Sequence, residues 1–382
     1  MLYWEIVKKV LIVRMLLGMK FVDVSFFLFL FLLISCTTPK GKPLSVPSES
    51  ICFNELKKKD FSDLLESVET KYILLRNENS KELFGRIDKI KIINDRIYIA
   101  DTKLRSLAVY DMQGNFISQI GKRGQGPAEY VNLTDFDVDK EGNVFVLDAR
   151  QNKLLCYDKD FTCIDDIRLD FQSDILTVLD NDSLLFGLSS WNKKEGKGRK
   201  IAKADRKGNI AKTFLDYDEY VDPAYWISMY TFSAAGDVLA YNQTIDNTIY
   251  LFSKDGELSE SITLDFGSEN VPDEDKVNIE RKLESYDNYC LIRKIVAVTD
   301  NAIIGFIWQH RQTKLFVIDR KSGYCYLSDA LDDVDRRPGC GYFNGELISY
   351  IDAESEALPD SVNEFVRNEG FVLLLQNVGS SK

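Results

Sequence analysis

The sequence predicts an all-β fold, namely a single closed six-bladed β-propeller with four-stranded blades and one short helical insertion. Three observations lead to this expectation: an internal repeat of about 47 residues, short alternating strands within each repeat, and an N-terminal strand that can complete the last blade. The repeat is clearest in Arg96–Phe116 and Asn143–Cys163. Each stretch has an apolar run that ends in Asp, with a second Asp ten residues later. A period of this length made of short strands is typical of propellers and not of helical solenoids.

The repeated step is an aromatic or apolar residue followed by a short polar one at the end of a strand. It occurs at intervals of 47, 47, 48 and 66 residues, at Asp111, Asp158, Asp205, Ser253 and Asp319. Within one unit the expected strands are Thr134–Asp139, Asn143–Asp148, Lys153–Asp158 and Thr162–Asp170, separated by turns rich in Gly, Asn and Asp.

Five such units lie between Arg86 and about Asp329. The sixth combines Gly345–Asp352, Gly370–Gln376 and, from the other end of the domain, Lys71–Asn77. Borrowing the N-terminal strand closes the ring and removes an open sheet edge that would favour aggregation.

The N-terminal region predicts export and a lipid anchor. The apolar run Phe26–Cys36 falls short of the roughly 20 residues that a membrane-spanning helix needs. Met19 and Lys20 form a short positive n-region, and Leu33–Cys36 resembles a bacterial lipobox, which implies that Cys36 is lipidated and becomes the first mature residue. We therefore assign residues 1–18 to an extension upstream of the true start, 19–35 to a lipoprotein signal peptide, 36–66 to the lipidated Cys and a tether, and 67–382 to the propeller.

Composition and charge limit the classes of function. The chain has 382 residues, of which 45% are apolar, and a formal net charge of −12. Because phosphate binding needs a basic surface, we expect no nucleic-acid partner. No cysteine spacing indicates zinc or a disulfide framework. Cys156 and Cys163 flank an expected hairpin turn, and they either pair across it or, after a one-residue change of register, lie on opposite faces.

One segment carries a family resemblance. Ile97–Tyr130, and within it the Gly-rich stretch Gly121–Tyr130, resembles the six-bladed, NHL-related propeller lipoproteins of Bacteroidetes. In architecture the match covers most of Tyr72–Gln376, with Ala128 where that pattern often has Gly. The resemblance implies the fold and the anchor but no activity. Residues 37–42 lack the acidic residues that resemble a surface-export signal in such lipoproteins, so we expect an outer-membrane protein that faces the periplasm.

The connections between strands form two sets, which emerge on opposite faces of a propeller. Those that join strand two to three, or strand four to the next blade, are long, and the others are mostly tight turns. Binding sites are usually built from long loops on a rigid scaffold, so we expect the ligand on the long-loop face. The candidate residues are aromatic or basic: Arg123, Tyr130, Arg150, Trp191, Tyr225, Trp226, Trp308, Arg311 and Arg336. Any one of these side chains could instead pack the ends of the blades against one another, without contacting a ligand.

Three further features of that face have structural interpretations. Pro272–Tyr289 has Pro at its start, early acidic residues and later basic ones, which predicts a short helix. Gly121–Gly126 lacks the Lys-Ser/Thr ending of a P-loop, so we expect a turn between blades. His310, the only histidine, is expected to be an exposed loop residue beside Trp308.

Two classes of function remain. The first is a binding or scaffold module that recognises a glycan, peptide or envelope protein, without a cofactor and with catalytic residues unknown. The second is a propeller lyase or lactonase with a divalent cation in the axial pocket, for which Asp101, Asp148 and Asn242 are candidate ligands. Because Asp101 and Asp148 occupy equivalent positions in the repeat, they are more naturally caps of turns. The sequence does not separate the first class from a purely structural subunit of an envelope complex.

Overall fold

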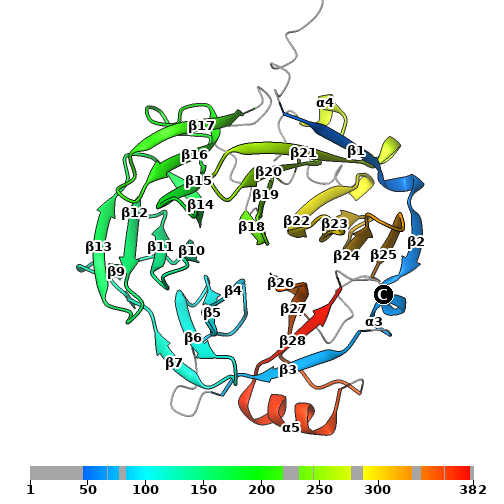
Figure 1. Ribbon diagram of the computed structural model, residues 1–382, viewed down its shortest axis with the longest axis horizontal. Coiled ribbons are helices and arrows are strands. Elements are labelled where there is room, and N and C mark those ends of the chain that lie inside the picture. Colours follow the sequence, from blue (N-terminus) through cyan, green and yellow to red (C-terminus); the bar gives the residue numbers. More distant parts are fainter. Residues whose placement is uncertain are drawn as a thin grey trace, which may run out of the picture. The chain divides into compact units, whose positions relative to one another are not determined.

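The computed structural model describes residues 46–66, 68–76, 83–217, 232–243, 245–276, 287–328, 337–356 and 358–378. Six sheets of four or five strands follow one another around an axis (Figure 1). Their innermost strands contact one another in sequence, and the last contacts the first, so the ring is closed. The predicted six-bladed propeller is confirmed.

In the first five blades the first four strands run from inner to outer in the order of the chain, and in the last blade the outer strand comes from the N-terminal region. The first three blades are β4 (Lys89–Ile93), β5 (Arg96–Asp101), β6 (Ser106–Asp111), β7 (Phe116–Gln119); β10 (Asp135–Val138), β11 (Val144–Asp148), β12 (Lys153–Tyr157), β13 (Cys163–Arg168); and β14 (Ser173–Val178), β15 (Ser183–Leu188), β16 (Arg199–Asp205), β17 (Ile210–Asp216). The last three are β18 (Phe232–Ala235), β19 (Val238–Asn242), β20 (Thr248–Ser253), β21 (Leu258–Asp265); β22 (Leu291–Val298), β23 (Ala302–Gln309), β24 (Gln312–Asp319), β25 (Tyr324–Leu327); and β26 (Arg337–Phe343), β27 (Glu346–Ile351), β28 (Val372–Asn377), β3 (Thr70–Leu74). A two-stranded ribbon, β8 (Lys122–Arg123) with β9 (Glu129–Tyr130), links blades 1 and 2.

The N-terminal strand β3 closes the ring as expected. It pairs antiparallel with β28, with Ile73 opposite Leu373. The neighbouring Leu75 is fully buried among the side chains of blades 1 and 6. The last blade therefore combines strands from the N-terminal and the C-terminal parts of the domain, and their pairing closes the ring.

The expected tether differs from what the structure shows. From Val46 onward the chain belongs to the propeller, because β1 (Ser48–Cys52) pairs in parallel with β21 and β2 (Lys57–Asp60) pairs in parallel with β25. Each adds a fifth, outermost strand to its blade (Figure 1). The two strands flank a 3-10 turn, Phe53–Glu55, whose Phe53 is buried. The domain therefore begins about 20 residues before the predicted boundary.

The repeated acidic residues hold the turns. Asp111 at the end of β6 accepts hydrogen bonds from the backbone N–H groups of Gln113 and Asn115, and Asp205 at the end of β16 does the same for Lys207 and Asn209. A carboxylate that accepts backbone donors in this way fixes a tight turn. The repeat detected in the sequence is thus a repeat of turn chemistry.

The described residues contain three α-helices: α3 (Phe61–Leu65), α4 (Asp273–Lys276) and α5 (Asp360–Glu369). The helix expected over 272–289 is described only as α4, because residues 277–286 lie outside the described ranges. The sequence analysis missed α5, which packs Val362, Phe365 and Val366 against blade 6. None of the described helices is long and apolar enough to cross a membrane.

Cys156 and Cys163 are both free thiols. A bulge after Cys156 pairs Cys156 with Asp165 and Tyr157 with Cys163. Cys163 is thus paired with Tyr157, the residue after Cys156, and successive residues of a strand point to opposite faces of the sheet. The register therefore fits the second alternative, in which the two cysteines lie on opposite faces.

The two faces of the ring differ in their connections, as expected. Turns of two to five residues join strand one to two and strand three to four, and we call this side the tight-turn face. The long-loop face carries, among its described connections, residues 120–134, 189–198 and 266–276 and the connection that contains α5. Two connections on this side are short or partly strand: His310 and Arg311 form a two-residue hairpin turn with positive φ, and β26 occupies residues 337–343.

Candidate functional site

Tyr130 is a core residue and not a surface one. Its side chain is fully buried, and its hydroxyl donates to the carbonyl of Ile120 at 3.0 Å. Burial raises the pKa of this hydroxyl well above its usual range, so it stays a neutral donor. The expectation that Tyr130 contacts a ligand is therefore wrong, and the packing interpretation holds for it.

Trp308 and Arg311 hold a loop in place. Trp308 packs beside Val271 and Leu291, with Arg293 over its ring at 5.4 Å. Arg311 is exposed but pairs with Asp287 at 2.6 Å, and Nε2 of His310 lies 3.0 Å from a carboxylate oxygen of Glu269. The hairpin turn thus binds both ends of the connection from β21 to β22. These contacts explain both residues structurally.

The other predicted residues are dispersed. Arg123 is exposed on the ribbon between blades 1 and 2, and Arg150 is exposed on the turn between β11 and β12. Tyr225, Trp226, Arg336 and Cys36 lie outside the described residues. Among the described candidates, Trp191 lines a cavity.

That cavity, the Trp191 pocket, encloses about 470 Å³ on the long-loop face between blades 2 and 3. It is lined by Asn152, Asp170, Phe171, Gln172, Trp191, Asn192, Lys193 and Lys194. The Trp191 side chain is partly exposed there. The side-chain oxygens of Asn152 and Gln172 are buried and have no hydrogen-bond partner among the described residues. Unpaired buried acceptors are uncommon in folded proteins and call for an explanation.

The walls of the Trp191 pocket are fixed before any ligand arrives. Asn192 accepts a hydrogen bond from the backbone N–H of Gln172 at 2.8 Å and donates to its carbonyl at 2.8 Å. It also donates to the carbonyl of Ser189. This clasp ties the loop 189–198 to the segment that enters β14. The hydrogen bonds of Asn192 thus fix the loop that carries Trp191, so less conformational entropy is lost when a ligand binds.

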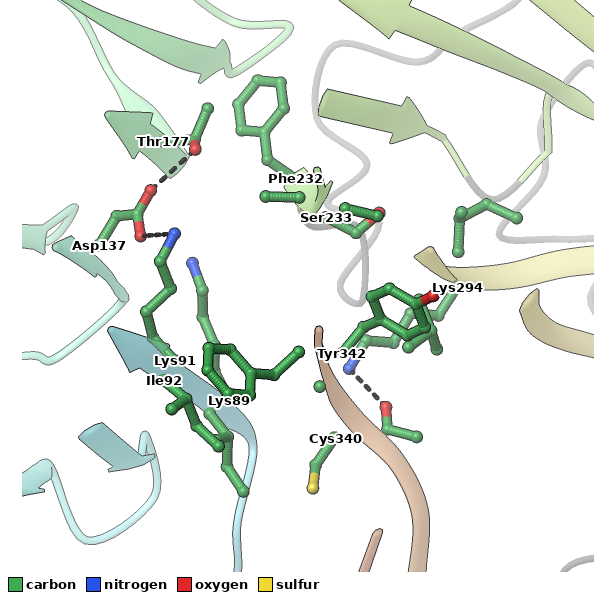
Figure 2. Close-up of a pocket in the computed structure, with 18 of the residues that line it drawn as sticks. Lys89, Lys91, Ile92, Asp137, Thr177, Phe232, Ser233, Lys294, Cys340 and Tyr342 are labelled. Carbon is green, nitrogen blue, oxygen red and sulfur yellow. Dashed lines mark hydrogen bonds and ion pairs between the residues drawn. The ribbon is translucent and has the colours of Figure 1, made fainter. Parts of the chain in front are cut away.

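A second cavity lies on the propeller axis. It encloses about 290 Å³, and its lining residues come from the innermost strands of all six blades or from the turns next to them (Figure 2). Three lysines reach it: Lys89 and Lys91 from β4 and Lys294 from β22. A neighbouring cavity of about 260 Å³ shares Lys91, Thr177, Ala234 and Gly236 with it and extends to the turns of the tight-turn face. We call the first of these the axial pocket.

Two aspartates of β10 organise the axial charges. Lys89 pairs with Asp135 at 2.7 Å, and Lys91 pairs with Asp137 at 2.9 Å. The second oxygen of Asp135 accepts from the N–H of Leu176. That of Asp137 accepts from the hydroxyl of Thr177 (Figure 2) and from the N–H of Val178. These carboxylates therefore join the inner strands of three blades.

The environment of Asp137 favours its charged form. Burial alone would raise the pKa of Asp137, but the ammonium groups of Lys91 and Lys89 and the hydrogen bond from Val178 outweigh burial and lower the pKa to about 2. Asp137 is thus ionised throughout the physiological range. Each of its oxygens already has a cationic or hydrogen-bonding partner.

The residues at the axis do not fit a divalent cation. Ca²⁺ and Mg²⁺ need several free oxygen ligands, whereas the oxygens of Asp135 and Asp137 are paired with lysines and backbone donors. Asp101 accepts the backbone N–H groups of Gly85, Arg86 and Leu104, and Asp148 those of Val131, Asn132 and Gln151. Both act as turn caps in equivalent positions. Asn242 likewise donates to the carbonyls of Asp246 and Thr248.

The sequence analysis missed the polar residues of both cavities. Asn152 and Gln172 come from different connections, and only the ring brings them beside Trp191. A signal for the axial pocket was present, since charged residues alternate with apolar ones in Lys89–Ile92 and Asp135–Asp139, both on first strands of blades.

Comparisons with known proteins support the fold. The family model described as Domain of unknown function (DUF4934) matches residues 47–359. The chain is similar to a Bacteroides fragilis NCTC 9343 protein described as exported, at 18% identity and a TM-score of 0.69, over 87% of this chain and 99% of that chain. It is also similar to a Bacteroides vulgatus ATCC 8482 member of the DUF4221 family, at 10% identity and a TM-score of 0.47, over 81% and 97% of the two chains. A virginiamycin B lyase from Staphylococcus aureus, catalytically inactive and with quinupristin, has 12% identity and a TM-score of 0.44, over 80% and 99%. No curated protein matches the chain.

Proposed function

The chain belongs to the family described as Domain of unknown function (DUF4934), and we propose that it is a binding module whose Trp191 pocket takes a glycan. The observation that carries this proposal is the pair of unpaired amide oxygens of Asn152 and Gln172 beside a partly exposed Trp. A pocket with convergent polar groups on the long-loop face is a general mark of a binding site.

The chemistry of the Trp191 pocket favours a ligand that is rich in hydroxyl donors. Asn152 and Gln172 each hold a buried, unpaired acceptor oxygen among the lining residues, and the exposed carboxylate of Asp170 supplies an acceptor that a ligand reaches directly. The indole of Trp191 supplies a flat apolar surface of the kind on which the C–H face of a sugar ring packs. A sugar satisfies both requirements at once, because its hydroxyls donate from the edge of a ring that has an apolar face. A peptide would match the acceptors through its N–H groups but would use the indole less completely.

Binding to a glycan array, followed by calorimetry with the best sugar, tests the proposal. Trp191→Ala should weaken binding at least tenfold, which corresponds to about 1.4 kcal/mol. Gln172→Met removes the unpaired oxygen and keeps the volume, so it should weaken binding without lowering the melting temperature. Lys140→Ala, an exposed substitution on the tight-turn face, is the matched control and should leave affinity unchanged.

Other outcomes would contradict the proposal. If Trp191→Ala binds the sugar as tightly as the wild type, or if only peptides bind, the glycan assignment is wrong. Trp308→Ala and Arg311→Ala separate loop support from recognition. Because both residues hold the connection from β21 to β22, their substitution should lower the melting temperature and leave affinity at the Trp191 pocket nearly unchanged.

We further infer that the module is attached to the cell envelope through Cys36. The support is the lipobox-like Leu33–Cys36, together with the description of a structurally similar Bacteroides fragilis protein as exported. The absence of acidic residues just after Cys36 favours the periplasmic side of the outer membrane. Protease treatment of whole cells should therefore leave the propeller intact, and digestion of the domain would contradict this orientation.

A further inference from the structure

Lys294 is the axial lysine that lacks a carboxylate partner. Lys89 and Lys91 each pair with an aspartate of β10, whereas no Asp or Glu of the described residues lies within 4.0 Å of the Lys294 ammonium. Its Nζ donates to the carbonyl of Gly339 at 3.3 Å (Figure 2). Gly339 adopts a φ of 71°, and a Cβ there would lie 2.2 Å from the ring of Phe306, so glycine is required at this point of β26.

The charges that face the axial pocket do not balance. Three lysines reach it, but the two aspartates are fully engaged by Lys89, Lys91 and backbone donors of β10 and β14. One positive charge, on Lys294, is left over. A buried charge without a partner is costly, so such a group either loses its charge through a shifted pKa or keeps it beside an opposite charge.

The environment of Lys294 points in the same direction. Burial is the largest effect on the pKa of Lys294 and lowers it; Cys340, Asp88 and Asp135 oppose this shift, whereas the nearby Lys89 adds to it. The ammonium form is therefore held in a site that disfavours it. A bound anion would stabilise that form, because an opposite charge within a few ångströms raises the pKa of a lysine.

The rest of the pocket indicates the size and the nature of the anion. Ile92, Phe232 and Val296 supply apolar walls, and Tyr342 also lines the pocket (Figure 2). The hydroxyl oxygen of Ser233 is shielded from solvent and has no hydrogen-bond partner among the described residues. A volume of about 290 Å³ with one excess charge matches a small organic monoanion better than a phosphate dianion.

We propose that the axial pocket binds a small organic carboxylate, whose charged group pairs with Lys294 and accepts a hydrogen bond from Ser233. The ligand enters from the tight-turn face, because the cavity next to the axial pocket extends to the turns 139–141 and 180–182. This site is distinct from the Trp191 pocket in position and in chemistry, and neither proposal depends on the other.

Calorimetric titration of the full chain with benzoate and hexanoate tests the proposal, with benzamide and hexanamide as uncharged analogues of the same shape. The carboxylates should bind and the amides should not. Lys294→Met keeps the aliphatic stem and removes the charge, so it should weaken carboxylate binding at least tenfold. Lys321→Met, at an exposed lysine of a tight turn, should bind as the wild type does.

Two further readouts keep the test decisive. Because Lys294→Met removes an uncompensated charge, the variant should melt at or above the wild-type temperature, so that lost binding is not lost folding. Wild-type affinity should fall as pH rises above the lowered pKa of Lys294, and the affinity of Lys294→Met should not follow that trend. Equal binding of amides and carboxylates, tighter binding of inorganic phosphate, no binding of either carboxylate at millimolar concentration, or unchanged affinity in Lys294→Met would each overturn the proposal.

Discussion

Replacing Phe53 by Ala tests whether the segment before β3 is part of the domain or only a tether. Phe53 lies between β1 and β2 and is 1% exposed. Its ring meets Phe266 at 5.0 Å and Phe316 at 5.9 Å, both in edge-to-face geometry. The ammonium of Lys58 lies 3.4 Å from the ring centroid. Phe53 therefore fastens two outermost strands to the core of blades 4 and 5.

The expected loss is large relative to the stability of a domain. Removing a buried Phe side chain costs about 3–5 kcal/mol, and edge-to-face pairs contribute about 0.5–1.5 kcal/mol each beyond burial, which favours the upper part of that range. Folded domains have a free energy of unfolding of about 5–15 kcal/mol. At roughly 2 °C per kcal/mol for a large domain, the melting temperature should fall by about 6–10 °C.

Thermal and urea unfolding, followed by circular dichroism, measure this loss. Glu55→Ala, two residues away and exposed, is the matched control and should change the free energy of unfolding by less than about 0.5 kcal/mol. If Phe53→Ala and Glu55→Ala unfold alike, Phe53 does not anchor the segment, and residues 46–66 are the tether that the sequence suggested.

Three other perturbations have defined outcomes. A chain that begins at Glu78 lacks β1, β2 and β3 and should lose cooperative unfolding, so a sharp transition near the wild-type temperature would refute ring closure by β3. The lowered pKa of Asp137 means that its stabilising contribution, about 2 kcal/mol, is present above pH 4 and is lost as pH falls toward 2. Asp137→Asn should flatten the stability profile in that window, and an unchanged acid profile would count against the Lys91 pairing. Cys36→Ala should abolish labelling by radioactive fatty acid in cells, and equal labelling would exclude Cys36 as the anchor.

The repeat could be predicted because it consists of local chemistry. Asp111, Asp158 and Asp205 each accept backbone donors two and four residues ahead, so the same short pattern recurs wherever the same turn is built. The succession of blades follows from these turns, and ring closure follows from the N-terminal strand that completes the last blade. The fold was therefore recoverable from the sequence.

The fifth strands could not be predicted in the same way. All four residues of β2, Lys57–Asp60, are exposed, so the strand has no alternation of apolar and polar residues. Its pairing with β25 combines backbone hydrogen bonds, which any sequence can make, with lysine stems such as that of Lys59, whose ammonium lies 3.9 Å from the centroid of the Tyr324 ring. The side chains that fix it in place, Phe53 and Phe61, lie outside the strand. Hydrophobic periodicity detects strands that bury side chains and misses those that only extend a sheet.

The candidate sites show a similar limit. The aromatic composition of the long-loop face singled out Trp191, but Trp308 and Tyr130 carried the same signal and are packing residues. Unpaired acceptors such as Gln172 distinguish a pocket from a packed blade end, and their pairing depends on neighbours from another part of the chain. Residue type therefore nominated Trp191, and only the three-dimensional arrangement separated it from the others.

The strand β14 connects the two proposed sites and explains why they can act independently. Gln172 precedes this strand on the long-loop face, and Thr177, its next-to-last residue, lines the axial pocket. Close to the end of the strand, Asp135 and Asp137 accept hydrogen bonds from the N–H groups of Leu176 and Val178, at the inner edge where no further strand pairs with β14. A ligand couples two sites only if it shifts an element that both sites share. Because the aspartates of the neighbouring blade fix β14 at its inner edge, a sugar at Trp191 has little means of moving the axial lysines. Asp135 and Asp137 pair with Lys89 and Lys91 and therefore do not neutralise Lys294. Because the same two carboxylates fix β14, an anion bound at Lys294 should not change the affinity of the Trp191 pocket.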